Sequence, residues 1–278
     1  MNQYKYALID ANFILKRNCE AVFRGLQGGI SKDDIIRSFN QSVNKLQREI
    51  GFNHGLLLFD KFPYYKSAFL PEYKGDRVYI NEEYLENYMK ENPNPDPMEL
   101  YNIQNQVTKN RECIRAKYEI INTRRFDRTP VIKKGFEADD LAYLLACKLK
   151  DKPYRSILIA TDSDWLTFTN PQVDYISMKK DKETGEYITK AKTINTLKLI
   201  SNALKIPLYD IGILNELFLE SHNNIQTYRD KHPEVKYRDF CEAMYNSEDK
   251  VPDYSEYKSY YDGMNMRSHA NEIEVKLE

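Results

Sequence analysis

The stretch GFEADDLAYLLACKL, residues 135 to 149, places the carboxylates of Glu137, Asp139 and Asp140 immediately ahead of an apolar helical run. A short apolar pair, Val131 and Ile132, precedes it and reads as a strand that feeds this helix. Acidic residues in a first helical turn commonly stabilise the helix through its dipole. Three of them within four positions also suit a site that binds a cation, and the stretch alone leaves both interpretations open.

Four further apolar runs have the length of buried strands. They cover residues 6 to 10, 55 to 60, 156 to 161 and 173 to 177, and a helical pattern over residues 31 to 50 separates the first two. Continuous apolar runs that alternate with helices are typical of parallel strands covered on both faces. The sequence therefore predicts an α/β fold with a mostly parallel central sheet and helices on both of its faces.

Acidic residues end three of these strands: Asp10, Asp60, and Asp162 with Asp164. Ligands of parallel sheets bind outside the carboxyl ends of the strands, so these side chains should converge at one edge. The helix that follows Val131 and Ile132 should begin at the same edge. The expected acidic cluster contains Asp10, Asp60, Glu137, Asp139, Asp140, Asp162 and Asp164.

Seven carboxylates at one edge repel one another, and burial adds to the cost of keeping them charged. Oxygen-only ligands without His or Cys favour a hard divalent cation, Mg²⁺ or Mn²⁺. Two such ions about 4 Å apart suit hydrolysis of a phosphodiester. Taken singly, Asp10 and Asp60 can be turn residues, and Asp162 and Asp164 can cap the next helix.

Residues 61 to 130 interrupt the alternation of strands and helices. They are polar and rich in tyrosine, and they contain NPNPDP at residues 92 to 97, which cannot continue a helix. From residue 105 to 135 there are nine Lys or Arg against three Asp or Glu. Such a stripe can follow a phosphate backbone, and tyrosines can stack on unpaired bases. The predicted nucleic-acid contacts are Tyr73, Lys109, Arg111, Arg115, Lys117, Arg124, Arg125 and Arg128. The alternative is a solvated helix face on which tyrosines pack against Lys and Arg stems.

Overall composition is less informative. The 278 residues carry a net charge of -1, which argues neither for nor against nucleic acid. No apolar stretch approaches a membrane span, and the amino-terminal residues do not form a signal peptide. The four cysteines form no CxxC pair and read as free thiols, with Cys147 as a small core residue. We therefore expect an intracellular, cytoplasmic protein.

The order of these pieces resembles the 5′-nuclease superfamily, which includes flap endonucleases and phage-type 5′→3′ exonucleases, with the phage ribonuclease H branch nearest. The motifs, in chain order, are ALIDANFILKR, LLLFDKF, YKGDR, GFEADD and ATDSDWLTF. They match the family's acidic motifs and the basic motif that opens its helical arch. The combination is specific, whereas each motif alone is weak.

The resemblance implies a PIN-like nuclease domain over residues 1 to 200, with an arch inserted at about residues 61 to 130. Lys74 and Arg77 would hold the scissile phosphate. The implied enzyme is a Mg²⁺-dependent, two-metal 5′ nuclease that acts on DNA or RNA–DNA junctions, removing flaps or primers during phage replication in the bacterial cytoplasm. A replication protein such as a single-strand-binding protein is a candidate partner.

The resemblance weakens after residue 200. The family places a further acidic pair and a glycine-rich helix-hairpin-helix there, whereas this chain offers Glu220 as one metal ligand and the neutral Asn223. Residues 201 to 278 are instead expected to form a small, divergent helical region. Two alternatives remain: a PIN-type ribonuclease that cuts single-stranded RNA, and a branched-DNA-binding protein whose nuclease site has degenerated.

Overall fold

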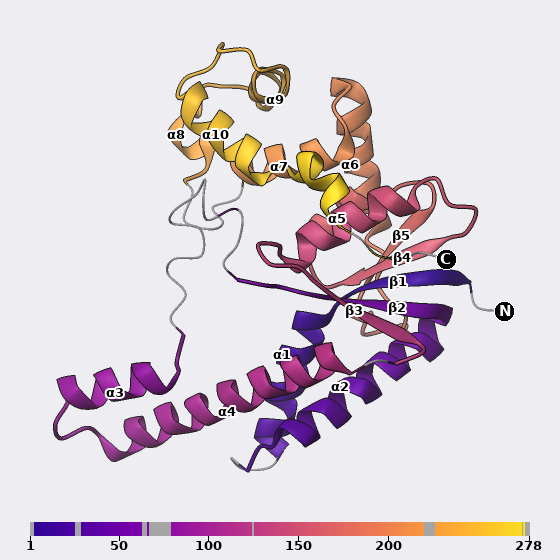
Figure 1. Ribbon diagram of the computed structural model, residues 1–278. Helices are drawn as coiled ribbons and strands as arrows, with labels where there is room; N and C mark the ends of the chain where they lie inside the picture. Colours follow the sequence, from indigo (N-terminus) through magenta and orange to yellow (C-terminus); the bar gives the residue numbers. More distant parts are fainter. Residues whose placement is uncertain are drawn as a thin grey trace.

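A computed structural model describes residues 3–25, 29–62, 66, 79–123, 125–219, 226–273 and 275. Within them, a five-stranded parallel sheet forms the centre of the molecule, in the order β3-β2-β1-β4-β5 (Figure 1). The strands are β1 Tyr4–Asp10, β2 Phe52–Phe59, β3 Arg128–Ile132, β4 Ser156–Ala160 and β5 Val173–Ser177. This confirms the predicted parallel sheet.

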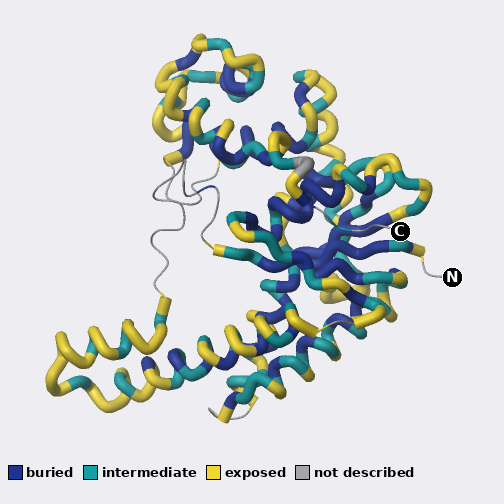
Figure 2. Tube along the Cα trace, viewed as in Figure 1, coloured by how far each residue is buried: buried dark blue, intermediate teal, exposed yellow. Residues whose placement is uncertain are grey.

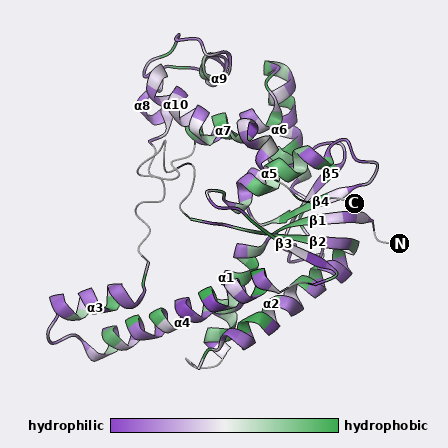
Figure 3. Cartoon of the chain, in the orientation of Figure 1, coloured by the Kyte–Doolittle hydropathy of each residue, from purple (hydrophilic) through white to green (hydrophobic). Residues whose placement is uncertain are grey.

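Side chains alternate between the two faces of the sheet. Ile9, Leu57 and Ile159 point to the face covered by α1 Ala11–Gly25, α2 Lys32–Leu46 and the second half of α4 Pro97–Asn122, and form one core. The opposite-facing positions form a second core with α5 Ala138–Leu149 and the carboxyl-terminal helices. Figure 2 shows the strands as the most buried part of the chain, and Figure 3 shows α5 as largely hydrophobic. Helices on both faces agree with the sequence prediction.

Helix α2 follows the signals in its sequence. Ser31 caps its amino end by accepting a hydrogen bond from the Asp34 backbone N–H at 3.3 Å. The regular helix ends at Leu46, and a π-helical turn, Gln47–Gly51, completes the predicted helical stretch. Gly51 has a φ of 78°, a conformation that suits glycine and turns the chain into β2.

The insertion between β2 and β3 forms two helices, α3 Glu82–Glu91 and α4 (Figure 1). Asp96 caps α4, and Pro97 occupies its first turn, where the missing N–H costs nothing. We call α3 and the first half of α4, residues 79 to 110, the arm. The arm extends from the body of the molecule, and much of it is exposed (Figure 2).

The carboxyl-terminal helices lie above α5 in Figure 1 and complete the second core. They are α6 Ala191–Leu204, α7 Leu208–Leu219, α8 Tyr228–Lys231, α9 Tyr237–Asn246 and α10 Tyr254–Met264, followed by the 3₁₀ helix Met266–Glu272. Asp210 is fully buried on α7 and accepts hydrogen bonds from Tyr261 at 2.5 Å and Asn265 at 3.1 Å. These polar contacts join α7 to α10 and the residue that follows it. No described helix is long and apolar enough to cross a membrane.

Cys147 corrects one expectation. It was expected in the core because it belongs to the apolar run of α5, but it is exposed. The last turn of α5 buries Ala146 and Leu149 and directs positions 147 and 148 away from the sheet. Because the run is apolar on almost every side of the helix, its sequence does not show which residues of the last turn are exposed.

Candidate active site

The acidic residues lie at the carboxyl edge of the sheet. Asp10 is the last residue of β1, Asp60 follows β2, and Asp162 and Asp164 follow β4. These three strands are neighbours in the sheet. Glu137 caps α5, which begins after the adjacent strand β3. The parallel topology therefore places the predicted acids at one edge.

Backbone hydrogen bonds fix several of these carboxylates. Asp60 Oδ1 accepts from the Ala138 N–H at 2.7 Å, which joins the end of β2 to the first turn of α5. Glu137 and Asp140 form a reciprocal capping box, in which Asp140 Oδ2 accepts from the Glu137 N–H at 2.9 Å. Helix capping is therefore correct for Glu137 and Asp140, and the caps hold both carboxylates at the edge of the sheet.

Trp165 positions Asp139. Its indole Nε1 donates to Asp139 Oδ1 at 2.7 Å, and its ring is fully buried in the 3₁₀ helix Asp164–Phe168. This hydrogen bond links α5 to the segment that follows β4. The sequence pattern does not predict this role of Trp165, although the only tryptophan of the chain directly follows Asp164.

Lys66 is a second residue that the sequence analysis missed. Its Nζ lies 2.9 Å from Asp140 Oδ1 and 3.1 Å from Glu137 Oε2, and the residue is 8% exposed. A buried ammonium group between two buried carboxylates offsets their repulsion. Nothing in the local sequence pattern distinguishes this lysine from the others of the insertion.

Burial and mutual repulsion perturb the acids. Burial raises the pKa of Asp10 to about 6, and the charges of Asp60 and Asp162 add to this rise, while the Phe13 N–H opposes it. Burial also raises the pKa of Asp139 well above its usual range. The nearby charges of Glu137 and Asp162 add to that rise, whereas Lys66 and the Trp165 N–H oppose it. The negative charge of Asp162 therefore raises the pKa of both Asp10 and Asp139.

The donor set fits a hard divalent cation by its chemistry. Its members are carboxylates, and a cation would offset both the burial and the repulsion between neighbouring charges that raise the pKa of Asp10 and Asp139. Among the described residues, however, no three His, Cys, Asp or Glu side chains form a ready-made metal-binding group. Local hydrogen bonds hold one oxygen each of Asp60, Asp139 and Asp162, the last through the Asp164 N–H at 3.0 Å.

Several predicted site residues lie outside the described part of the chain. They are Tyr73, Lys74, Arg77, Arg124 and Glu220, together with Asn223. Their roles therefore stay predictions.

One of the predicted nucleic-acid contacts, Lys117, reaches the acidic edge, because its Nζ donates to the Asp60 backbone carbonyl at 2.9 Å. Arg111 and Arg115 are exposed on α4 and share Glu112, at 3.4 and 2.9 Å. Arg125 is also exposed and pairs with Asp127. These residues can present positive charge to solvent.

Lys109 and Arg128 do not belong to an exposed basic face. Lys109 is 7% exposed, pairs with Glu20 at 2.6 Å, and lies over the Phe23 ring of α1. Arg128 is 3% exposed and bonds to Asp127 and to side chains of α2. The predicted stripe ignored the packing of α1 and α2 against α4 and β3, which buries these two cations.

The change Arg128→Ala should therefore affect folding rather than nucleic-acid binding. It removes hydrogen bonds to Asn40 and Asn44 and breaks the ion pair with Asp127, so we expect a loss of about 2–3 kcal/mol in the free energy of unfolding. Urea denaturation measures this loss. The exposed neighbour gives a matched control, since Arg125→Ala should cost under about 0.5 kcal/mol. Equal losses for both variants would contradict the assigned roles.

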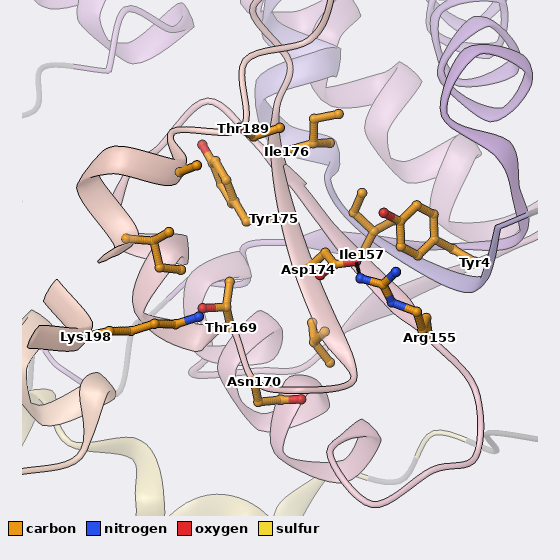
Figure 4. Close-up of a pocket in the computed structure, with 13 residues that line it drawn as sticks. Tyr4, Arg155, Ile157, Thr169, Asn170, Asp174, Tyr175, Ile176, Thr189 and Lys198 are labelled. Carbon is orange, nitrogen blue, oxygen red and sulfur yellow. Dashed lines mark hydrogen bonds and ion pairs between the residues drawn. The ribbon is translucent and has the colours of Figure 1, made fainter. Parts of the chain in front are cut away.

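A cavity elsewhere on the sheet is not part of the acidic edge. It measures about 350 Å³ and is lined by α6, by β5 and by residues at the amino ends of β1 and β4, including Tyr4, Arg155 and Asp174 (Figure 4). Arg155 and Asp174 form an ion pair there. Because the acids lie at the opposite ends of β1 and β4, this cavity is separate from the acidic edge.

Comparison with known proteins agrees with this architecture. Three solved structures of bacteriophage T5 proteins are similar to the chain. A T5 protein crystallised with metal ions has a TM-score of 0.55 at 15% identity, and covers 96% of this chain and 91% of its own. A T5 flap endonuclease in a pseudo-enzyme-product complex with DNA and metal ions has a TM-score of 0.54 at 17% identity, with the same coverage. A T5 5′-exonuclease mutant has a TM-score of 0.50 at 14% identity, and covers 97% of this chain and 91% of its own.

At these identities, the likeness establishes the fold. No curated protein matches the chain by sequence. The family model of the 5′-3′ exonuclease N-terminal resolvase-like domain matches residues 5–198, a span that contains the sheet, the arm and the acidic edge. Because this match covers most of the chain, the protein belongs to the 5′-3′ exonuclease family of nucleases.

Proposed function

We propose that this protein is a divalent-metal-dependent 5′ nuclease that cuts DNA flaps or RNA–DNA junctions. The observation that carries the proposal is that acidic residues at the ends of β1, β2 and β4 and at the start of α5 lie at one edge of the sheet. There, the charge of Asp162 raises the pKa of both Asp10 and Asp139. The T5 flap endonuclease of the same fold was solved with DNA and metal ions, which supports both the substrate class and the cofactor.

The cofactor of this proposal is Mg²⁺ or Mn²⁺, as two ions. Asp10, Asp60 and Asp162 would hold one ion, and Glu137, Asp139 and Asp162 the other. Asp140, Asp164 and Glu220 remain further proposed ligands. When bound, such ions lower the pKa of an attacking water and stabilise charge on the phosphate.

The chain's own residues orient these ligands. The Ala138 N–H holds one oxygen of Asp60, and the Trp165 indole holds one oxygen of Asp139. Lys66 supplies a fixed positive charge beside Glu137 and Asp140. These contacts preset the ligand positions before substrate binds.

The arm supports a nucleic-acid substrate with unpaired bases. Tyr79 and Tyr101 are more than half exposed, and so is Tyr118 on the same helix nearer the acids. Arg111 and Arg115 lie between them along the chain and are exposed. Stacking on tyrosines and pairing of phosphates with arginines bind single strands with little sequence preference. A PIN-type ribonuclease lacks a long insertion of this kind, so the arm favours the 5′ nuclease. Lys74 and Arg77 remain the proposed contacts to the scissile phosphate.

Cleavage of end-labelled substrates in Mg²⁺ tests the proposal. The panel contains a 5′ flap, a nicked duplex, an RNA–DNA hybrid and single-stranded RNA, each with and without EDTA. We expect cutting at the flap or from the 5′ end, lost with EDTA. Cutting of single-stranded RNA alone would instead establish the PIN-type activity. Tight junction binding without cutting in Mg²⁺ or Mn²⁺ would establish a degenerate site.

Trp165 offers a substrate-free report on metal binding. Its indole donates to Asp139, so a cation that binds Asp139 should change the environment of the only tryptophan. We expect Mn²⁺ or Mg²⁺ to shift or quench the tryptophan fluorescence saturably, with at least about tenfold weaker apparent affinity in Asp139→Asn. Asp174→Asn, at the amino end of β5, is the matched control. An identical response of wild type and Asp139→Asn would contradict the assignment.

A further inference from the structure

Two cysteines from distant parts of the sequence meet at the junction of α1 and α4. Cys19 is buried on α1, and Cys113 is partly exposed on α4. Cys19 Sγ lies 3.7 Å from the Lys109 carbonyl oxygen, one helical turn before Cys113, and Cys113 packs against the hydrophobic core that contains Cys19. Because α1 and α4 pack against each other here, the two cysteines lie at one interface between these helices.

The surroundings of the two thiols are unequal. The contact with Cys19 lowers the pKa of Cys113, and the charges of Lys117 and Lys109 lower it further, although burial opposes them. The contact with Cys113 and burial raise the pKa of Cys19. The negative charge of Glu20 raises the pKa of both thiols. Cys113 is thus the more nucleophilic thiol and also the more accessible one.

We propose that Cys113 and Cys19 form a reversible disulfide on reaction with a peroxide. The Cys113 thiolate attacks one peroxide oxygen and breaks the O–O bond, which leaves a sulfenic acid and releases water or an alcohol after proton uptake. The Cys19 sulfur then attacks the sulfenic sulfur, the S–O bond breaks, and water leaves as Cys19 loses its proton. Two thiols are oxidised and one peroxide is reduced.

The position of this pair gives the disulfide a mechanical consequence. Helix α1 begins directly after Asp10, and α4 continues outward from Cys113 into the arm. One turn beyond Cys113, Lys117 donates to the Asp60 carbonyl. A cross-link would therefore fix the base of the arm against the helix that leaves the acidic edge. The cross-link chemistry does not depend on the proposed nuclease function.

The test uses the reduced full-length chain, treated with a small excess of hydrogen peroxide, alkylated, and analysed by intact-mass and peptide mass spectrometry. We expect one disulfide, between Cys19 and Cys113, that dithiothreitol reverses. In Cys19→Ser, Cys113 should accumulate a dimedone-reactive sulfenic acid, and Cys113→Ser should form no cross-link. Circular dichroism confirms that each variant is folded.

The other two cysteines provide the controls. Cys147 is exposed and Cys241 is buried. They therefore show whether oxidation depends on the exposure of a thiol or on a neighbouring thiol. Cys147→Ser and Cys241→Ser should leave the cross-link unchanged, and Cys113 should react with peroxide at least about tenfold faster than Cys147. Faster oxidation of Cys147, or a disulfide that excludes either Cys19 or Cys113, would overturn the proposal. Because both readouts are chemical, loss of cleavage activity alone would not affect them.

Discussion

Replacing Asp162 with asparagine should lower metal-dependent cleavage by about a thousandfold or more. The Asp162 charge raises the pKa of both Asp10 and Asp139, and we assign Asp162 as a ligand of both proposed metal ions. Asparagine keeps the size of the side chain and an oxygen that can accept from the Asp164 N–H, now at 3.0 Å. The variant should therefore fold normally, and the loss should appear in the rate of cleavage at saturating Mg²⁺.

The matched control is Asp174→Asn. Asp174 lies on the neighbouring strand β5, pairs with Arg155, and is remote from the acidic edge. Its replacement should leave cleavage within about twofold of wild type. If Asp162→Asn cut as fast as Asp174→Asn, Asp162 would be only the turn residue that its position after β4 also allows.

Replacing Asp10 with asparagine should have two opposite effects. Cleavage should fall by about a thousandfold, because Asp10 is an assigned metal ligand. The metal-free protein should become more stable at neutral pH by about 1–3 kcal/mol, because the variant no longer keeps a buried charge beside Asp60 and Asp162. Asparagine preserves the acceptor for the Phe13 N–H, which lies 3.0 Å from Asp10 Oδ1.

The pH dependence of the free energy of unfolding tests whether the Asp10 charge destabilises the metal-free protein. The pKa of Asp10 is raised from 3.8 to about 6 on folding, so the folded protein holds this proton more tightly than the unfolded chain. The unfavourable contribution of Asp10 is therefore absent below pH 3.8, grows as pH rises towards 6, and is constant above it. Urea denaturation in EDTA across this range should show a falling stability in wild type that Asp10→Asn partly removes. A variant less stable than wild type at pH 7 would mean that Asp10 acts as a structural cap.

Much of this edge could be predicted from the sequence. Apolar runs that end in Asp10, Asp60 and Asp162 mark parallel strands, and parallel strands bring their carboxyl ends together. Capping and metal binding, which the sequence offered as alternatives for Glu137, are compatible in the structure. The capping box with Asp140 holds both carboxylates where the metal site is proposed.

The remaining features depend on contacts between distant segments. From the sequence, Lys109 and Arg128 belong to a basic stripe. In the structure both are buried, and they donate hydrogen bonds to Glu20 on α1 and Asn44 on α2. The hydrogen bond from Trp165 to Asp139 joins two elements whose distance no local pattern gives. Side-chain periodicity identifies the face of a single helix, whereas these partners depend on how neighbouring helices pack.

Calorimetric titration of Mg²⁺ and Mn²⁺ into the metal-free protein tests the central claim most directly, because it needs no assumption about the substrate. We expect saturable binding that Asp162→Asn weakens by at least about tenfold and Asp174→Asn leaves unchanged. Absence of binding, or equal binding by Asp162→Asn and wild type, would contradict the assignment of the acidic edge as a metal site.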